Sequence, residues 1–152
     1  MIATLAFYLA IATAVSAALV GGILFAFSTF IMPALARRPA AQAAAAMQAI
    51  NETVYTPWVM VPFVGTGFAL LALTAMAWLG AAPALGAPLH VSGATGLYVC
   101  GCILLTGTRN VPMNEHLATL EPTSDEAARY WPHYGSRWTA WNHLRTAACL
   151  LA

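Results

Sequence analysis

The last apolar segment of the chain carries three polar side chains within four consecutive positions, Asn142, His143 and Arg145. Polar groups are costly inside a membrane, so they usually mark a functional site. At about 100° per residue, one helix face would hold Trp138, Thr139, Asn142, Arg145, Thr146 and Cys149, with His143 and Trp141 at its two margins. An ionised guanidinium without partners is expensive in hydrocarbon. This face must therefore meet other helices, a cavity or a ligand.

A second polar group, Arg109, Asn110 and Asn114, ends the preceding apolar segment at nearly the same depth. Together the two groups suit an aromatic ligand that bears an acidic phenol or enol. Trp138 and Trp141 would stack on its rings, Arg145 would stabilise its anion, and the asparagines, including Asn142, would donate to carbonyl oxygen. His143 is the expected proton acceptor. A structural interpretation stays open, in which these side chains only tie two helices together by hydrogen bonds.

The composition indicates an integral membrane protein whatever these residues do. Hydrophobic residues make up 61% of the chain and charged residues only 7%, whereas soluble domains carry roughly a quarter charged residues. No charged residue occurs from Met1 to Ala36, and no basic region precedes this stretch, so we expect a retained first span rather than a signal peptide. All six basic residues are arginines. We therefore expect membrane lipid and no nucleic acid among the partners.

The sequence predicts an all-α fold, a four-transmembrane-helix antiparallel bundle in one domain over residues 1–152. The predicted spans are about 2–31, 57–79, 89–106 and 133–152. Alanine-rich residues Pro39 to Tyr55 predict an additional amphipathic helix between the first two spans, either at the membrane interface or as an extension of the second span. Small residues in the spans allow close helix contacts, within one chain or in a homo-oligomer.

The arginines predict the orientation of the bundle. Five of them lie in or beside the two connections that follow the first and third spans: Arg37, Arg38, Arg109, Arg129 and, at the start of the fourth span, Arg137. Basic residues favour the cytoplasmic side, so both polar loops are expected in the cytoplasm and both termini outside.

Several kinds of cofactor site find little support in the residues present. The chain has no Glu-x-x-His motif of the kind that builds di-iron bundles. The thiols of Cys100 and Cys102 point to different sides of a helix, so we expect no metal site. The expected cofactor is none; haem held by His143 alone, or a quinone, stays as an alternative.

Four motifs resemble the anthrone oxygenase-like membrane family, and together they cover nearly the whole chain. They are Phe25-Ala-Phe-Ser28 with Met32-Pro33, Met47-Gln-Ala-Ile-Asn51, Asn110-Val-Pro112-x-Asn114, and Trp138-x-x-Trp141-Asn142-His143-x-Arg145-Thr146. The resemblance implies a four-helix membrane fold and adds Asn51 to the expected ligand-binding residues. It also implies that an anthrone is oxidised to an anthraquinone by molecular oxygen, without metal or flavin. Because the relatives with established roles act in aromatic polyketide pathways, the expected ligand is a small hydrophobic aromatic compound.

On this interpretation, His143 or a neighbouring base removes the ring-methylene proton, and Arg145 with the asparagines holds the enolate that reacts with oxygen. The expected location is a bacterial inner membrane. The competing hypothesis is a non-enzymatic membrane module that binds a lipid, a quinone or haem, or that packs against a partner protein.

Overall fold

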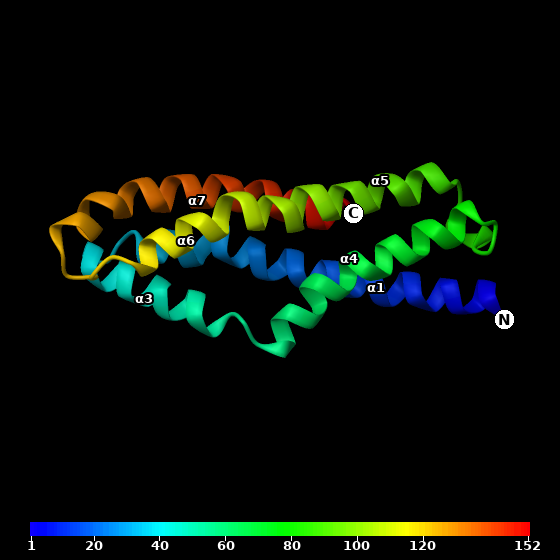
Figure 1. Ribbon diagram of the computed structural model, residues 1–152, viewed down its shortest axis with the longest axis horizontal. Coiled ribbons are helices and arrows are strands. Elements are labelled where there is room, and N and C mark those ends of the chain that lie inside the picture. The colour runs from blue at the N-terminus through cyan, green and yellow to red at the C-terminus, as the bar shows by residue number, and fades with distance from the viewer.

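A computed structural model describes residues 1–152, and its regular secondary structure is entirely helical. The longest run begins with α1 (Ile2–Ala26), continues through a π-helical turn (Phe27–Ile31) and ends with α2 (Met32–Leu35). After α3 (Ala40–Thr53), α4 (Pro57–Trp78) returns along α1. A second continuous run holds α5 (Pro88–Tyr98), two π-helical stretches (Val99–Leu104 and Thr106–Asn110) and α6 (Val111–Ala118). The last helix, α7 (Asp125–Leu151), lies along both long runs (Figure 1).

A proline follows π-helical backbone in each of the two long runs. Pro33 comes just after the turn at Phe27–Ile31, and Pro112 just after the stretch at Thr106–Asn110. Proline has no amide hydrogen, and its ring clashes with the carbonyl four residues earlier. A widened turn can absorb this mismatch without ending the helix. Both long helices therefore continue past their prolines.

Three helical runs are long and apolar enough to cross a membrane, Ile2–Leu35, Pro57–Trp78 and Pro88–Ala118. The first and third extend beyond the predicted 2–31 and 89–106. The first has 34 residues, about 51 Å at 1.5 Å per residue, so it is longer than the roughly 30 Å hydrocarbon core. The helix α7 is not among the three, and it begins at Asp125 rather than near 133. Its first half carries charged residues that lower its hydropathy.

The predicted helix between the first two spans is present as α3, a helix separate from α4. The two helices meet at a corner formed by Val54–Thr56, so α3 is not an extension of the second span (Figure 1). Its fully buried Ala43, Ala44 and Met47 belong to a core shared with α6 and α7. Gln48 reaches the same neighbours, because its amide donates to the carbonyls of Leu117 and Leu120, each at 2.8 Å.

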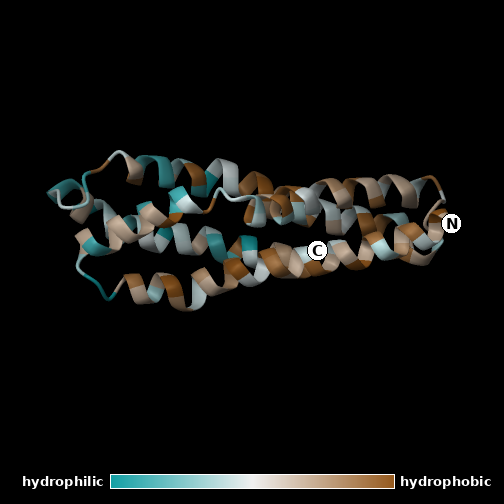
Figure 2. Ribbon diagram, turned by 90° about the horizontal axis from the view of Figure 1, so that it is seen from below, coloured by the Kyte–Doolittle hydropathy of each residue, from teal (hydrophilic) through white to brown (hydrophobic).

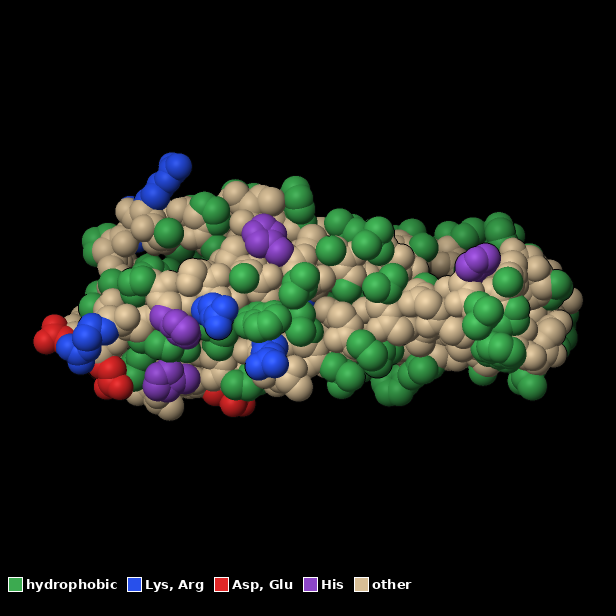
Figure 3. All heavy atoms as spheres, turned by 90° about the horizontal axis from the view of Figure 1, so that it is seen from above, with side chains coloured by type: hydrophobic (Ala, Val, Ile, Leu, Met, Phe, Trp, Pro, Cys, Tyr) green, Lys and Arg blue, Asp and Glu red, His purple; other side chains and the backbone are tan.

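Polar and apolar residues divide the molecule along its length. The loops that join α3 and α6 to their neighbours are hydrophilic, and so is the start of α7. The half built from α1, α4 and α5 is mainly hydrophobic (Figure 2). Charged side chains gather on the same polar half of the surface (Figure 3). The outward side chains of the other half are large and apolar, among them Phe7, Leu19 and Phe68.

Candidate functional site

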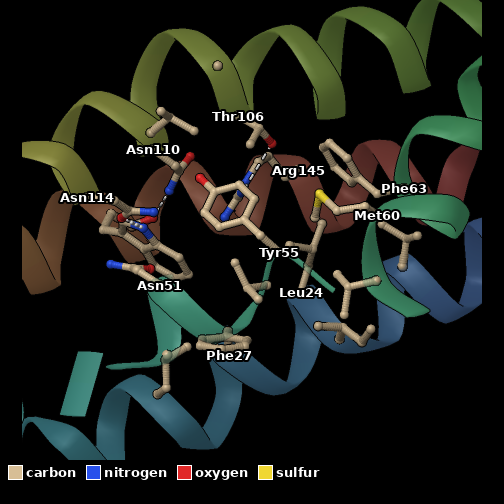
Figure 4. A pocket seen from close by; sticks show the side chains of 18 of the residues that line it. Leu24, Phe27, Asn51, Tyr55, Met60, Phe63, Thr106, Asn110, Asn114 and Arg145 are labelled. Carbon is tan, nitrogen blue, oxygen red and sulfur yellow. Dashed lines mark hydrogen bonds between the residues drawn. The ribbon is translucent and has the colours of Figure 1, made fainter. Parts of the chain in front are cut away.

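A cavity of about 350 Å³ lies where the polar and apolar halves of the molecule meet (Figure 4). Residues from α1, α3, the corner after α3, α4, the run from α5 to α6, and α7 all line it. Most of the lining side chains are hydrophobic; the polar ones are Asn51, Tyr55, Thr106, Asn110, Asn114 and Arg145. The cavity therefore has a largely apolar wall with a few polar groups, as expected for a site that binds a small organic molecule.

Arg145 is the only charged residue that lines the cavity, and its contacts are neutral. The side chain is 5% exposed. One terminal nitrogen donates to Thr106 Oγ1 at 3.0 Å, and the other donates to Asn142 Oδ1. The guanidinium carbon also lies 5.2 Å from the ring centre of Trp138, close enough for a cation–π contact. No carboxylate takes part, because all five acidic residues of the chain are exposed elsewhere. The positive charge therefore lacks a counter-ion within the protein.

Asn142 sets the rotation of α7 and so aims Arg145 at the cavity. Its amide nitrogen donates to the Leu24 carbonyl and to Ser28 Oγ, both at 2.6 Å, while its oxygen accepts from Arg145. Asn142 is fully buried and does not line the cavity itself. It therefore acts on a ligand only through Arg145 and through the packing of α7 on α1.

Two asparagines of the third apolar segment also contact α7. Asn110 donates to the Trp138 carbonyl at 3.2 Å. Asn114 Oδ1 accepts from the Tyr134 hydroxyl and from the Trp138 indole, both at 2.8 Å. Because one asparagine oxygen holds both aromatic groups, the Trp138 ring is fixed at the cavity wall.

Three buried polar atoms have no hydrogen-bond partner: Asn51 Nδ2, Asn110 Oδ1 and Arg145 Nε. All three belong to residues that line the cavity. Buried polar groups are nearly always paired, and each unpaired group costs about 1–3 kcal/mol. Their concentration around one cavity indicates two donors and one acceptor available to a ligand or to water.

The structure brings five of the predicted site residues to this cavity: Asn51, Asn110, Asn114, Trp138 and Arg145. Arg109 and Trp141 do not line it. They stack on each other at the protein surface, with the guanidinium carbon 5.1 Å from the indole centre. The contacts among Asn110, Asn142 and the aromatic residues also include the interhelical hydrogen bonds expected from the structural interpretation.

His143 lies away from the cavity. It is exposed and lines a different hollow, beside Met32, Pro33 and Trp131. Positions 143 and 145 are about 200° apart on a helix, so a helix that turns Arg145 inward turns His143 outward. The expectation that the two side chains share one site is therefore wrong. No group of three or more His, Cys, Asp or Glu side chains is arranged to hold a metal ion.

Two polar lining residues, Thr106 and Tyr55, were missed in the sequence. Thr106 had a detectable signal, because it lies one helical turn before Asn110 and two turns before Asn114 on one face. Tyr55 had none, because it occupies a corner rather than a helix, and only packing brings it to the cavity.

The sequence profile of the family described as anthrone oxygenase matches residues 58–152. The chain belongs to the anthrone oxygenase family. No curated protein and no solved structure matches the chain. The matched range contains Thr106, Asn110, Asn114, Trp138 and Arg145, whereas Asn51 and Tyr55 lie before it. The anthrone oxygenase profile thus covers the polar wall formed by the third apolar segment and α7.

Proposed function

We propose that this anthrone oxygenase family member binds an anthrone-like polycyclic phenol in the cavity and oxidises it with molecular oxygen, without a cofactor. One observation carries the proposal: the buried guanidinium of Arg145 lines an apolar cavity and contacts only neutral groups. A phenolate or enolate ligand would supply the missing counter-ion. A positive charge within about 4–6 Å lowers the pKa of an acid by about 1 to 3, so the cavity favours the ionised ligand.

The cavity fits such a ligand in its volume and in the separation of apolar from polar residues along its wall. Its volume of about 350 Å³ lies within the range of roughly 300–1,000 Å³ that is usual for small-molecule sites. Leu24, Met60 and Phe63 offer an apolar wall for fused rings. Thr106, Asn110 and Arg145 lie together beyond them (Figure 4). There the unpaired Nε of Arg145 would donate to a ring oxygen, and the unpaired Oδ1 of Asn110 would accept from a ring hydroxyl.

The reaction balances without a second reductant. Loss of one proton from the ring methylene gives the enolate, which Arg145 stabilises. The enolate carbon gives electrons to oxygen and forms a carbon–oxygen bond, and protonation gives a hydroperoxide. Loss of water from this hydroperoxide breaks the oxygen–oxygen bond and the remaining carbon–hydrogen bond. One oxygen atom becomes the new quinone carbonyl and the other leaves as water.

No protein base is assigned to the first step, because His143 lies outside the cavity. The proton passes to solvent, and the positive charge of Arg145 makes the ligand acidic enough for this to occur near neutral pH. Arg145 is the catalytic residue of this scheme. Asn142 is a positioning residue, since it holds Arg145 without lining the cavity.

The test is conversion of anthrone to anthraquinone by protein reconstituted in lipid nanodiscs, under isotopically labelled oxygen. One labelled atom per quinone is expected, with turnover lost in Arg145→Met. Arg137→Met is the matched control, because Arg137 is an exposed arginine on the same helix. Turnover that persists in folded Arg145→Met would refute the role of the guanidinium. Tight binding of the quinone product without turnover would favour the alternative of a non-enzymatic module that binds a quinone.

We also propose that α7 is the fourth span of an antiparallel bundle in a bacterial inner membrane, with both polar loops in the cytoplasm. Close packing of its C-terminal half supports this: a Cβ at Gly21 would meet Leu150 at 2.9 Å, and one at Gly101 would meet Ala148 at 2.5 Å. Small residues of this kind let membrane helices approach closely. Reporter fusions at both termini should read outside the cytoplasm. Termini on opposite sides of the membrane would refute the fourth span, and two cytoplasmic termini would refute the proposed orientation.

A further inference from the structure

Two of the residues that line the cavity are also exposed at the protein surface, Tyr55 and Gly107. The remaining lining residues are buried or half-buried. A residue that is both exposed and part of the lining lies at the rim of an opening. Tyr55, which is 64% exposed, comes from the corner between α3 and α4. Gly107 comes from the π-helical stretch Thr106–Asn110. The opening therefore lies between these two elements.

The paths of the helices explain why a gap exists there. The helix α4 starts at the corner after α3 and diverges at that end from the run formed by α5 and α6 (Figure 1). Gly107 adds no side chain to close the space, and a Cβ built on it would meet no atom within 4 Å. Tyr55 is the large side chain on the other side. In the view of Figure 4 its ring lies between Leu24 and the polar side chains of Thr106 and Asn110.

The residues around the opening are typical of a membrane interface. Trp58, in the first turn of α4, is 86% exposed. Arg109 stacks on Trp141 at the surface two residues after Gly107. Tryptophan and tyrosine are enriched where hydrocarbon meets the headgroups, and arginine extends its charge toward the headgroups from the same level. The opening thus faces the boundary of the bilayer and not its centre.

We infer that the ligand enters the cavity sideways from the membrane interface, between Tyr55 and Gly107. This inference rests on the proposed function, because it requires that the cavity binds a ligand. It also defines the class of substrate: an amphiphile that is dissolved in the membrane, with an apolar ring system and one ionisable oxygen. Such a molecule gathers at the interface, and its oxygen can reach Arg145 while its rings contact the apolar wall.

The test compares Gly107→Phe with Gly96→Phe in lipid nanodiscs. Gly96 is a matched control, because it is an exposed glycine in the same helical run, has open space around its Cβ and does not line the cavity. The probe is dihydroxyanthraquinone, an air-stable product analogue, and its binding is followed by quenching of tryptophan fluorescence in a stopped-flow instrument. Tyr55→Ala serves as a second variant that widens the opening.

Phenylalanine at 107 should slow both association and dissociation several-fold, because a narrowed opening affects passage in both directions. Tyr55→Ala should accelerate both rates, and Gly96→Phe should match the wild type. Wild-type rates in both rim variants would overturn the inference, as would a weaker Kd in Gly107→Phe caused by faster dissociation alone. Failure of the wild-type protein to bind the probe would instead refute the proposed function.

Discussion

Replacing Arg145 by methionine should weaken the binding of an anionic ligand without lowering the stability of the protein. Methionine keeps an unbranched apolar stem in the space but removes the charge and the hydrogen bonds to Thr106 and Asn142. A hydrogen bond to a charged group contributes about 1.5–3 kcal/mol. An anionic ligand should therefore lose at least roughly 10- to 150-fold in Kd. A neutral ligand of the same shape should lose less, because it has no charge to pair with the guanidinium.

The stability of the same variant should change little. Asn142 Oδ1 would lose its partner, at a cost of about 1–3 kcal/mol. The wild-type protein bears a desolvation penalty of several kcal/mol for burying the Arg145 charge. Methionine has no charge to bury, so removal of this penalty offsets the cost of the unpaired Asn142 oxygen. We therefore expect the Tm of Arg145→Met to equal or exceed that of the wild type.

The assay measures Kd for two matched ligands, dihydroxyanthraquinone at alkaline pH and its dimethoxy ether, which cannot ionise. Quenching of tryptophan fluorescence reports on both, because Trp138 lines the cavity. The exposed Arg137, replaced by methionine, controls for a general loss of positive charge. Equal losses for the two ligands in Arg145→Met would refute the reasoning, because they would show that the guanidinium does not recognise the anion.

Three further changes test the packing around the site. Asn142→Ala should lower the free energy of unfolding by about 2–4 kcal/mol, because three buried hydrogen bonds disappear together; a Tm equal to the wild type would contradict its anchoring role. Gln48→Ala should speed hydrogen exchange in α3, since the Gln48 amide donates to the carbonyls of Leu117 and Leu120 and so ties α3 to the end of α6; unchanged exchange would show that apolar packing suffices. Gly101→Val should lower Tm by several degrees, because a Cβ there would lie 2.5 Å from that of Ala148, whereas the same change at an exposed glycine such as Gly96 should be neutral; equal effects would refute the close contact.

The membrane character of the chain and the unusual polar residues in its spans could be predicted from the sequence. Both depend on one physical cost, the transfer of polar groups into hydrocarbon. That cost is what made Arg145, Asn110 and Asn114 stand out, and the structure places all three at one cavity. Their similar depth in the membrane was expected from the lengths of the predicted spans alone. The motifs around them led to the anthrone oxygenase family, which the profile match over residues 58–152 confirms.

The rotation of α7 about its own axis could not be predicted from the sequence in the same way. A helical wheel placed His143 at the margin of the polar face, but the bonds from Asn142 to Leu24 and Ser28 fix the helix with His143 outside. These partners lie more than 110 positions away along the chain. Local periodicity contains no information about which of two neighbouring polar residues finds a distant acceptor.

By itself, the sequence determined the membrane character of the long apolar helices, the family, and the set of polar residues from which a site could form. The tertiary structure alone decided which of these residues face the cavity, that Tyr55 and Gly107 form its rim, and that Arg145 lacks a counter-ion. Hydropathy and helix propensity act over one or two turns of the chain. The cavity arises from the packing of five helical segments, where burial and hydrogen-bond geometry over long sequence separations select a single arrangement.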